Sequence, residues 1–472
     1  MLNPEFIKML DGLGPDYARL SAELDKGVPE VSVRLNQRKP GATPCGLTGP
    51  FDRVPWCYGG LYLPERPVFT LDPELHQGRY YVQDASSMCM WLVVNELNEK
   101  LGGGELRLLD ACAAPGGKTL CAADALDYGS LVVANEYDFR RAEVLRENVI
   151  KWGASPMSMV TRGDTARFSR VGELFDIVLV DAPCSGEGMM RKDTVAREQW
   201  TPSLVRECVE RQREILLNVW SALRPGGYLI YSTCTFNMLE NERNVEWFIG
   251  ETGAESVPSV VAGMPGVLPS LLSGVEAARF VPGHVRGEGL FVSVLHKPGD
   301  SAGKPLKIKM TKKGAGRRAQ RIASAVTPAQ LKEVTSWLNT HDVVIETVTN
   351  NKGETSIVAL PAGHAPFIAS QRDNLDIILQ GTPLAEVKGK NLIPSHPLAM
   401  SGLLTADAFP AAEVDCETAL HYLRGESVTL AETTARGFVL LTYCGQPLGF
   451  VKNLGNRANN LYPSSWRILR QL

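Results

Sequence analysis

The stretch 106–136, LRLLDACAAPGGKTLCAADALDYGSLVVANE, decides the fold class of this 472-residue chain. It reads as an apolar strand, a turn of small residues with two glycines, a helix over 117–126 and a second apolar strand over 131–136. Strands and helices that alternate in this way are typical of a parallel sheet covered by helices on both faces. The sequence therefore predicts an α/β, doubly wound domain. Its further strands are expected at 157–161, 175–180, 227–232 and 290–295. Its further helices are expected at 139–152, in a long segment that follows the 175–180 strand and ends near 223, and at 239–250.

Composition and pattern change on both sides of this domain. Helical spacing over 4–26 and an alternating strand at 31–35 precede it, and short strands at 427–430, 437–441 and 449–452 follow near the end of the chain. The predicted segments are a small N-terminal α+β module (1–80), the doubly wound domain (81–297), a basic linker (298–326), a small α+β module (327–389) and a β-rich module (390–472).

Bulk composition narrows the class of protein. Hydrophobic residues make up 44% of the chain and charged residues 21%, which is typical of a globular protein. The formal net charge of −3 excludes a uniformly basic nucleic-acid-binding protein. Charge is nevertheless concentrated locally, because residues 297–321 hold nine Lys or Arg and a single Asp. This basic strip predicts a polyanionic partner, with a solvated linker as the alternative.

The ten cysteines are scattered and form neither a CxxC pair nor a cysteine–histidine pattern, so we expect no metal site. The chain starts with a mixed, charged segment and not with a signal peptide. No apolar run reaches the roughly 18–20 residues of a membrane span. We therefore expect a cytoplasmic, monomeric protein with reduced thiols and no membrane partner.

A ligand pocket is predicted where the first strand ends. The turn 110–119, DACAAPGGKT, lets backbone amides approach a ligand at a helix N-terminus, and it is neither a Walker loop nor GxGxxG. Carboxylates also stand at or just after the ends of four strands, as Asp110, Glu136, Asp164 and Asp181. Each alone could cap a helix or face solvent. The carboxyl ends of parallel strands, however, meet at one rim, where such folds bind ligands.

Acidic groups without a phosphate-binding loop favour S-adenosylmethionine over a dinucleotide as the ligand. Glu136 is then expected to hold the ribose hydroxyls, Asp164 the adenine edge and Asp181 the ammonium group. The predicted cofactor contacts are Cys112, Ala113, Ala114, Pro115, Gly116, Gly117, Lys118, Glu136, Arg141, Asp164 and Asp181.

Two cysteines follow two of the predicted strands. Cys184 lies in 181–186, DAPCSG, and Cys234 lies in 232–235, STCT. If the two strands are parallel neighbours, both thiols reach the same crevice as the cofactor turn. One thiol suffices for most covalent catalysis. A second thiol suggests chemistry in which a covalent adduct must be both formed and dismantled.

Three motifs together resemble the Nol/Nop/Sun family of RNA 5-methylcytosine methyltransferases. They are DACAAPGGK (110–118), DAPCSGEG (181–188) and STCT (232–235). Shorter segments agree with the resemblance: RLN (34–36), QDASS (83–87), RFVPGH (279–284) and GEGLF (287–291). Beyond residue 297, the order of modules resembles bacterial members that act on 16S rRNA of the small ribosomal subunit and end in a PUA-like RNA-binding domain.

The resemblance implies a Rossmann-like fold and methyl transfer from S-adenosylmethionine to C5 of a cytosine in RNA, with 16S rRNA as the expected substrate. It also implies that Cys234 attacks C6 of the base, that Cys184 assists release, and that Asp181 and Lys118 support them. The residues alone leave the order of the thiols open, because a Pro-Cys turn supplies the nucleophile in DNA cytosine methyltransferases, which would favour Cys184. Alternative functions are a tRNA cytosine-5 methyltransferase, a non-catalytic rRNA-binding assembly factor, or a methyltransferase for proteins or small molecules.

An RNA substrate must present its target base outside a duplex and should bind basic side chains through its phosphates. The predicted RNA contacts come from the N-terminal module, from the segment after Cys184 and from the basic strip. They are Arg34, Asn36, Arg191, Lys192, Lys307, Lys309, Lys312, Lys313, Arg317 and Arg318.

Overall fold

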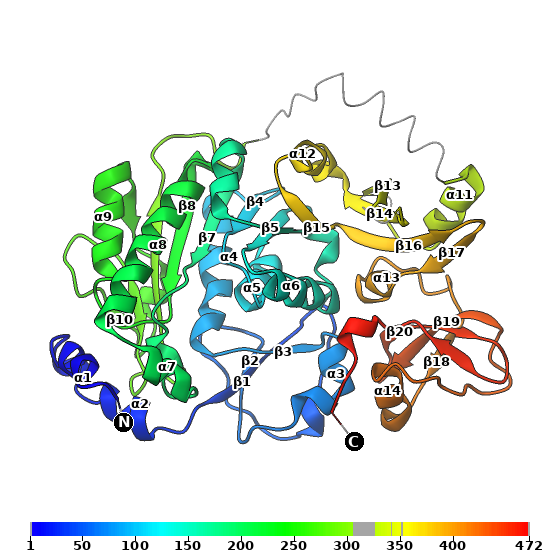
Figure 1. Cartoon of the computed structure of the whole chain (residues 1–472), viewed down its shortest axis with the longest axis horizontal. Coiled ribbons are helices and arrows are strands. Elements are labelled where there is room, and N and C mark those ends of the chain that lie inside the picture. Colours follow the sequence, from blue (N-terminus) through cyan, green and yellow to red (C-terminus); the bar gives the residue numbers. More distant parts are fainter. Residues whose placement is uncertain (1, 305–325, 341, 351–352, 471–472) are drawn as a thin grey trace.

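A ten-stranded sheet forms the centre of the computed structural model, which describes residues 2–304, 326–340, 342–350 and 353–470 (Figure 1). Its strands lie in the order β10-β11-β12-β8-β7-β4-β5-β6-β15, with β9 paired to β12. The five strands from β8 to β6 are parallel, so the predicted doubly wound α/β sheet is confirmed. The parallel strands are β4 (Arg107–Asp110), β5 (Leu131–Glu136), β6 (Ser158–Arg162), β7 (Phe175–Asp181) and β8 (Leu223–Thr233). The others are β9 (Glu255–Val257), β10 (Leu268–Pro269), β11 (Ala278–Phe280), β12 (Leu290–His296) and β15 (Asp376–Gln380).

Helices cover both faces of this sheet because its strands are apolar on both sides. Along β7, Ile177 and Leu179 point into one hydrophobic cluster, while Val178 and Val180 point into another. The first cluster holds residues of α4 (Met90–Lys100), α5 (Gly117–Ala125) and α6 (Phe139–Trp152). The second holds residues of α8 (Pro202–Trp220), α9 (Glu242–Thr252) and α12 (Ala365–Gln371).

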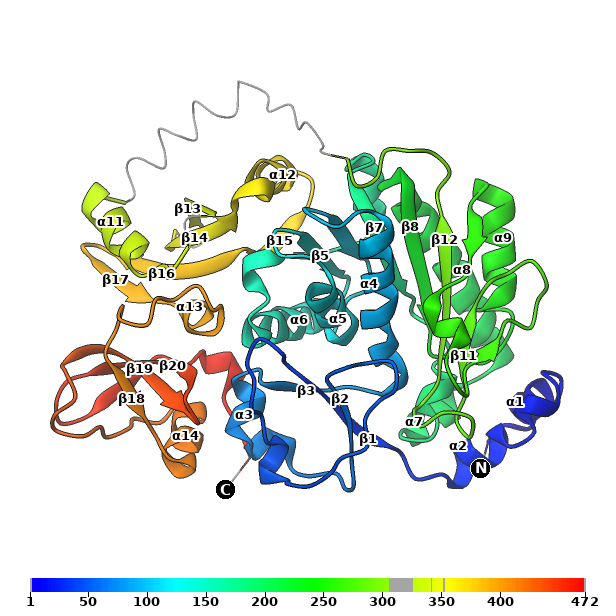
Figure 2. The ribbon, with the colours of Figure 1, turned by 180° about the vertical axis from the view of Figure 1, so that it is seen from behind.

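The N-terminal module lies against the carboxyl ends of the parallel strands (Figure 2). Its sheet has the order β2-β1-β3 and is antiparallel throughout. Two helices precede that sheet and pack with the loops that follow β7 and β8. The elements are α1 (Pro4–Asp11), α2 (Leu20–Lys26), β1 (Val31–Leu35), β2 (Gly60–Leu63), α3 (Pro73–His76) and β3 (Tyr80–Val82), and α7 (Thr194–Gln199) follows β7.

The predicted segment 327–389 does not stand apart from the main domain. Its strand β15 leaves the local sheet and pairs antiparallel with β6, where Arg162 forms an ion pair with Asp376. Its other three strands form a four-stranded sheet in the order β13-β14-β16-β17, whose last strand lies in the predicted segment 390–472. The elements are α11 (Pro328–Ser336), β13 (Val343–Thr349), β14 (Thr355–Pro361), β16 (Thr382–Lys388) and β17 (Asn391–Pro394).

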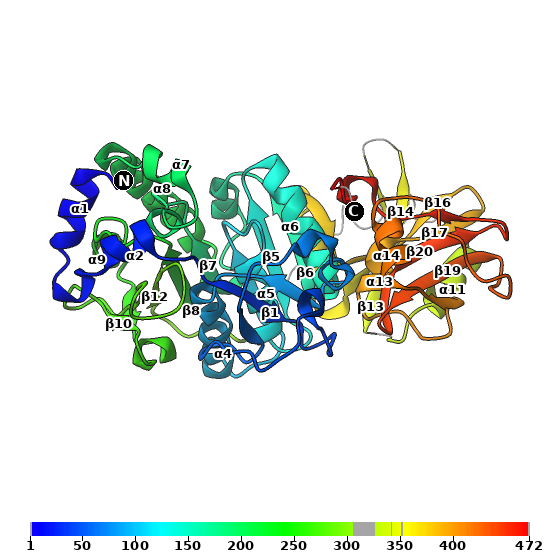
Figure 3. The same cartoon turned by 90° about the horizontal axis from the view of Figure 1, so that it is seen from below.

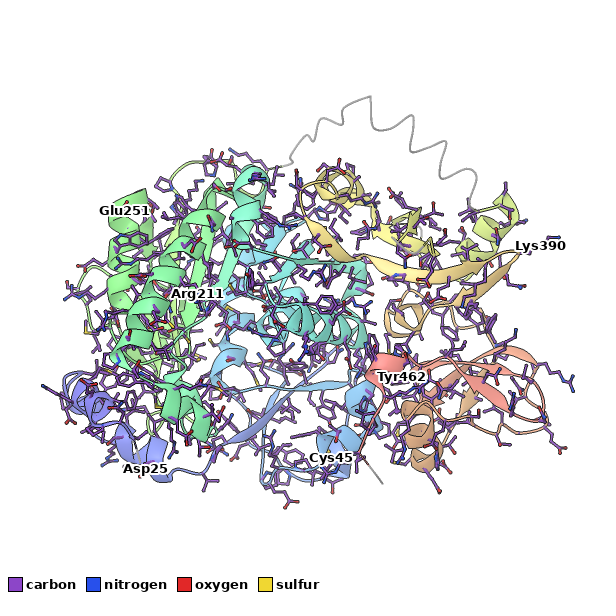
Figure 4. All side chains as sticks on the ribbon, viewed as in Figure 1. Asp25, Cys45, Arg211, Glu251, Lys390 and Tyr462 are labelled. Carbon is purple, nitrogen blue, oxygen red and sulfur yellow. The ribbon has the colours of Figure 1, made fainter. Side chains whose placement is uncertain are left out.

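A second four-stranded sheet, β18-β19-β20-β21, ends the chain (Figure 3). It meets the N-terminal module, where Gln77 donates hydrogen bonds to the carbonyls of Tyr443 and Gln446, and Tyr462 is buried near this junction (Figure 4). The strand expected at 427–430 is wrong, because only Val428 bridges to this sheet. The elements are α13 (His396–Met400), β18 (Ala411–Glu413), α14 (Cys416–Leu423), β19 (Gly437–Tyr443), β20 (Gln446–Asn453) and β21 (Ala458–Asn460).

Candidate active site

The two cysteines after β7 and β8 meet at the rim of the sheet. These strands are parallel neighbours, with Asp181 opposite Ser232. Cys184 and Cys234 follow within three residues of that pair, and their Sγ atoms lie 3.3 Å apart. The prediction that the two thiols share one crevice is therefore confirmed.

The two thiols differ in their surroundings. The pKa of Cys184 is raised well above its ordinary value, first by its hydrogen bond to Cys234 and then by burial. Either sulfur can be the donor in this contact. A thiolate is the reactive form of cysteine, and a neighbouring S–H at hydrogen-bond distance can stabilise it.

A partly buried ion pair stands beside the thiols. Lys118, at the start of α5, donates from Nζ to Oδ2 of Asp181 at 2.8 Å, and Ser232 donates from Oγ to Oδ1 at 2.9 Å. Burial alone would lower the pKa of Lys118, but the Asp181 carboxylate outweighs burial and raises it. Lys118 is therefore an ammonium that also lies within electrostatic reach of Cys234. The structure thus brings the four predicted catalytic residues together.

The turn between β4 and α5 presents backbone to the same rim. Gly116 has a φ of +117°, in the left-handed region that glycine adopts without strain. Glu136 accepts from the backbone N–H of Ala114 at 3.3 Å, and Arg141 donates to the carbonyl of Ala114 at 2.8 Å. The turn is therefore fixed by side chains from β5 and α6. A backbone turn that contacts Glu136 directly and Asp181 through Lys118 fits a ligand that carries sugar hydroxyls and an ammonium group.

Two of the predicted strand-end acids have structural contacts. Asp110 is fully buried below the turn and accepts from the hydroxyl of Thr119 at 2.6 Å, and burial raises its pKa to about 7. Asp164 caps the short helix at Thr165–Arg170 by accepting from the N–H of Ala166 at 2.8 Å. Asp110 therefore supports the turn from beneath, and a contact between Asp164 and an adenine edge stays a prediction.

Two predicted RNA contacts are wrong because the side chains are used inside the protein. Arg34 is 2% exposed, pairs with Asp124 and lies 4.4 Å from the ring of Trp152. Asn36 is 1% exposed and donates to the carbonyls of Gly78 and Trp152, each at 2.8 Å. Both residues fasten the N-terminal module to the main domain.

The two basic residues after Cys184, Arg191 and Lys192, differ in their exposure. The Arg191 side chain is 5% exposed and donates two hydrogen bonds to the Glu288 carboxylate, at 2.9 Å and 2.8 Å, so its predicted RNA contact is also wrong. Lys192 lies 3.4 Å from the same carboxylate with about a quarter of its side chain exposed, and its RNA contact stays a prediction. The remaining predicted contacts lie outside the described residues: Lys307, Lys309, Lys312, Lys313, Arg317 and Arg318.

Sequence reasoning missed two buried carboxylates, Glu187 and Glu240, between the loops that carry the thiols. The only signal was their position three and six residues after the cysteines. In the part of the chain that the structure describes, no group of three or more His, Cys, Asp or Glu side chains could hold a metal ion. None of the helices described there is long and apolar enough to cross a membrane.

Three family models match the chain. Residues 100–296 match the model described as 16S rRNA methyltransferase RsmB/F. Residues 2–85 match the N-terminal domain of 16S rRNA methyltransferase RsmF, and residues 409–468 match the methyltransferase RsmF PUA domain.

Similar proteins extend these matches over most of the chain. Ribosomal RNA small subunit methyltransferase F of Cronobacter sakazakii is 32% identical over 418 residues, which cover 87% of this chain and 83% of that protein. The Escherichia coli K12 protein of the same name is 30% identical and covers 92% of this chain and 89% of its own length. Among solved structures, NSun6 from Pyrococcus horikoshii with SFG shares the fold, with a TM-score of 0.52 and 20% identity over 63% of this chain and 97% of that chain.

Proposed function

Because the chain belongs to the RsmB/F family of S-adenosylmethionine-dependent RNA 5-methylcytosine methyltransferases, we propose that it methylates a cytosine of 16S rRNA through a covalent adduct on Cys234. The observation that carries the covalent step is the 3.3 Å separation of the Cys184 and Cys234 sulfurs at the rim. The names of the matching family models and relatives support the choice of 16S rRNA.

The residues at the rim divide between cofactor and base. The backbone of 113–117 with Glu136 would hold the nucleoside part of S-adenosylmethionine, and Asp181 its ammonium group. When bound, this cofactor supplies a methyl group on a sulfonium. About a third of the Asp181 side chain is exposed, so its carboxylate can also accept from the amino edge of a cytosine.

Cys234 activates a carbon that is otherwise a poor nucleophile. Its thiolate attacks C6, forms a C6–S bond and moves electron density to C5, which then takes the methyl group. The Cys184 S–H and the Lys118 ammonium both stabilise the thiolate before attack. Asp181 keeps Lys118 charged and in place.

Cys184 acts when the adduct breaks down. A base removes the proton at C5, the C5–C6 double bond re-forms, and the electron pair of the C6–S bond returns to Cys234. Cys184 donates a hydrogen bond to the departing sulfur, which makes it a better leaving group. The target base has to leave its stack to reach these thiols.

Methyl transfer from labelled cofactor tests the proposal. Free 16S rRNA, small subunits and tRNA are offered in parallel, and modified cytosines are mapped in a strain with and without the gene. We expect 5-methylcytosine in 16S rRNA that disappears in the deletion strain. Methylation of tRNA alone would show that tRNA and not 16S rRNA is the substrate. No 5-methylcytosine in any RNA would contradict the enzymatic function and favour a non-catalytic rRNA-binding assembly factor.

A further inference from the structure

Two carboxylates without a cation lie between the loops that carry the thiols. We call residues 182–190 the Cys184 loop and residues 234–241 the Cys234 loop. Glu187 of the first and Glu240 of the second are both 0% exposed. Among the described residues, neither forms an ion pair with Lys, Arg or His. Burying an ionised carboxylate without a counter-charge costs several kcal/mol, so these two side chains need a reason beyond packing.

Each carboxylate binds the loop to which it does not belong. Glu187 accepts from the backbone N–H groups of Phe236 and Asn237 in the Cys234 loop, at 2.6 Å and 3.0 Å. Glu240 accepts from the backbone N–H and the hydroxyl of Ser185 in the Cys184 loop. The Asn237 amide donates to both carboxylates, at 2.8 Å and 2.7 Å. The two loops are therefore joined by a reciprocal set of hydrogen bonds, which we call the exchange.

The backbone on both sides of Cys184 is held by this exchange. Ser185, which follows Cys184, donates its N–H to Glu240 at 3.0 Å. Pro183, which precedes it, accepts from the Gln212 amide, and the same amide donates to Glu240 at 2.7 Å. Cys234 is held as well, because its carbonyl accepts from the N–H of Gly188, the residue after Glu187, at 2.8 Å.

Only an acceptor suits these positions. The groups that bind Glu240 are the N–H and O–H of Ser185 and the amides of Gln212 and Asn237, all of which donate. Trp200 adds its indole N–H to the donors around Glu187. A glutamine in place of either glutamate would turn an NH₂ group toward one of these donors and leave it without a partner.

We propose that Glu187 and Glu240 are positioning residues that hold Cys184 against the Cys234 sulfur during release of the product. This inference rests on the proposed function, because it takes Cys234 as the nucleophile and Cys184 as the releasing thiol. A displacement of about 1 Å in catalytic geometry can lower a rate by about 100-fold. Loosening the exchange should therefore slow breakdown of the adduct more than its formation.

Glu240→Gln tests the inference through the covalent adduct. Single turnovers with labelled cofactor and substrate RNA are quenched in denaturant, and the protein–RNA band is compared with free methylated RNA. We expect adduct to accumulate on the order of tenfold above wild type, with turnover reduced by a similar factor. Cofactor affinity should not change, because Glu240 lies outside the turn that would hold the cofactor.

Asp176→Asn is the matched control. Asp176 is a buried carboxylate at the amino end of β7, where it binds the backbone N–H of Arg107 and the guanidinium of Arg224. Its loss should lower stability without raising the adduct. Should Glu240→Gln not fold, Ser185→Ala removes one donor of the exchange and should raise the adduct a few-fold.

The outcomes separate this inference from the proposed function. If Cys184→Ala traps adduct while Glu240→Gln or Ser185→Ala traps no more than wild type and Asp176→Asn, the positioning role is overturned and the thiol assignment stands. If Cys184→Ala itself traps none, the thiol assignment fails and the positioning role fails with it. Adduct in both Cys184→Ala and Glu240→Gln supports both.

Discussion

Charged side chains lie both at the rim of the sheet beside Cys184 and Cys234, which we call the rim, and at the contact between the N-terminal module and the main domain around Arg34, which we call the seam. Their surroundings in the two regions differ. At the rim, Lys118 and Asp181 form an ion pair whose carboxylate is 32% exposed, beside two half-buried thiols. At the seam, the Arg34 side chain is 3% exposed, and it is enclosed by Asp124 and Trp152. Residue type alone therefore does not separate a functional site from a structural one. The rim should respond to substitution in its chemistry, and the seam in its stability.

The largest expected effect is at the rim. Cys234→Ala should lower methyl transfer by on the order of 10⁴-fold or more, because it removes the nucleophile. It should form no adduct, whereas Cys184→Ala should accumulate one that survives denaturation. Gel shift of labelled RNA after denaturation measures both. Adduct in Cys234→Ala and none in Cys184→Ala would exchange the two roles.

The seam should give the largest change in stability. Arg34→Met removes one partner of a buried ion pair and should lower the free energy of unfolding by about 3–5 kcal/mol. Denaturant unfolding measures the loss, and RNA affinity is measured below the transition. If Arg34→Met had wild-type stability but bound RNA more weakly, Arg34 would be an RNA contact. The distinction between a functional rim and a structural seam would then be wrong.

Much of the rim could be predicted because it depends on local sequence and on one rule of topology. Apolar strands alternate with helices, and parallel strands bring their carboxyl ends to one edge, so Asp181, Cys184 and Cys234 had to converge. The family resemblance suggests the chemistry, and the family matches over 2–85, 100–296 and 409–468 confirm the family.

The seam could not be predicted because its partners are distant in sequence. Arg34 meets Asp124 ninety residues later, and no pattern near RLN (34–36) marks it as buried. The same limit applies to β15, whose residues read as part of a separate module until they pair with β6. Glu187 and Glu240 were missed because two carboxylates in loops are usually solvated.

Lys118 should give an intermediate effect at the rim. Lys118→Met removes the ammonium beside Cys234 and leaves Asp181 without its ion-pair partner, so kcat should fall by about 10²-fold to 10³-fold. The thiolate is then harder to form, and the rising limb of the pH–rate profile should move to higher pH. Steady-state rates between pH 6 and pH 10 test this shift. A lower rate with the limb in place would limit Lys118 to holding Asp181.

Glu136 should show a smaller effect, confined to the cofactor. Glu136→Gln keeps an acceptor but loses the charge that would hold ribose hydroxyls, so the Kd for S-adenosylmethionine should rise about tenfold. Calorimetric titration measures it. Glu143→Gln, on the more exposed part of α6, is the control and should leave the Kd as in wild type. Equal affinities in the two variants would remove Glu136 from the cofactor site.

The smallest effect is expected from the basic strip, because its start is far from the thiols. Lys304 is fastened at the amino end of β8, where its carbonyl accepts from Arg224, and Cys234 follows the other end of that eleven-residue strand. Residues 223–228 of β8 bulge against only 175–177 of β7, so at about 3.3 Å per extended residue roughly 20 Å separate the two ends. Replacing its lysines and arginines over 307–318 with Gln should therefore weaken RNA binding less than tenfold and flatten its salt dependence, with kcat at saturating RNA unchanged. A fall in kcat would show that the strip acts at the rim. An unchanged salt dependence would show that the strip is only a linker.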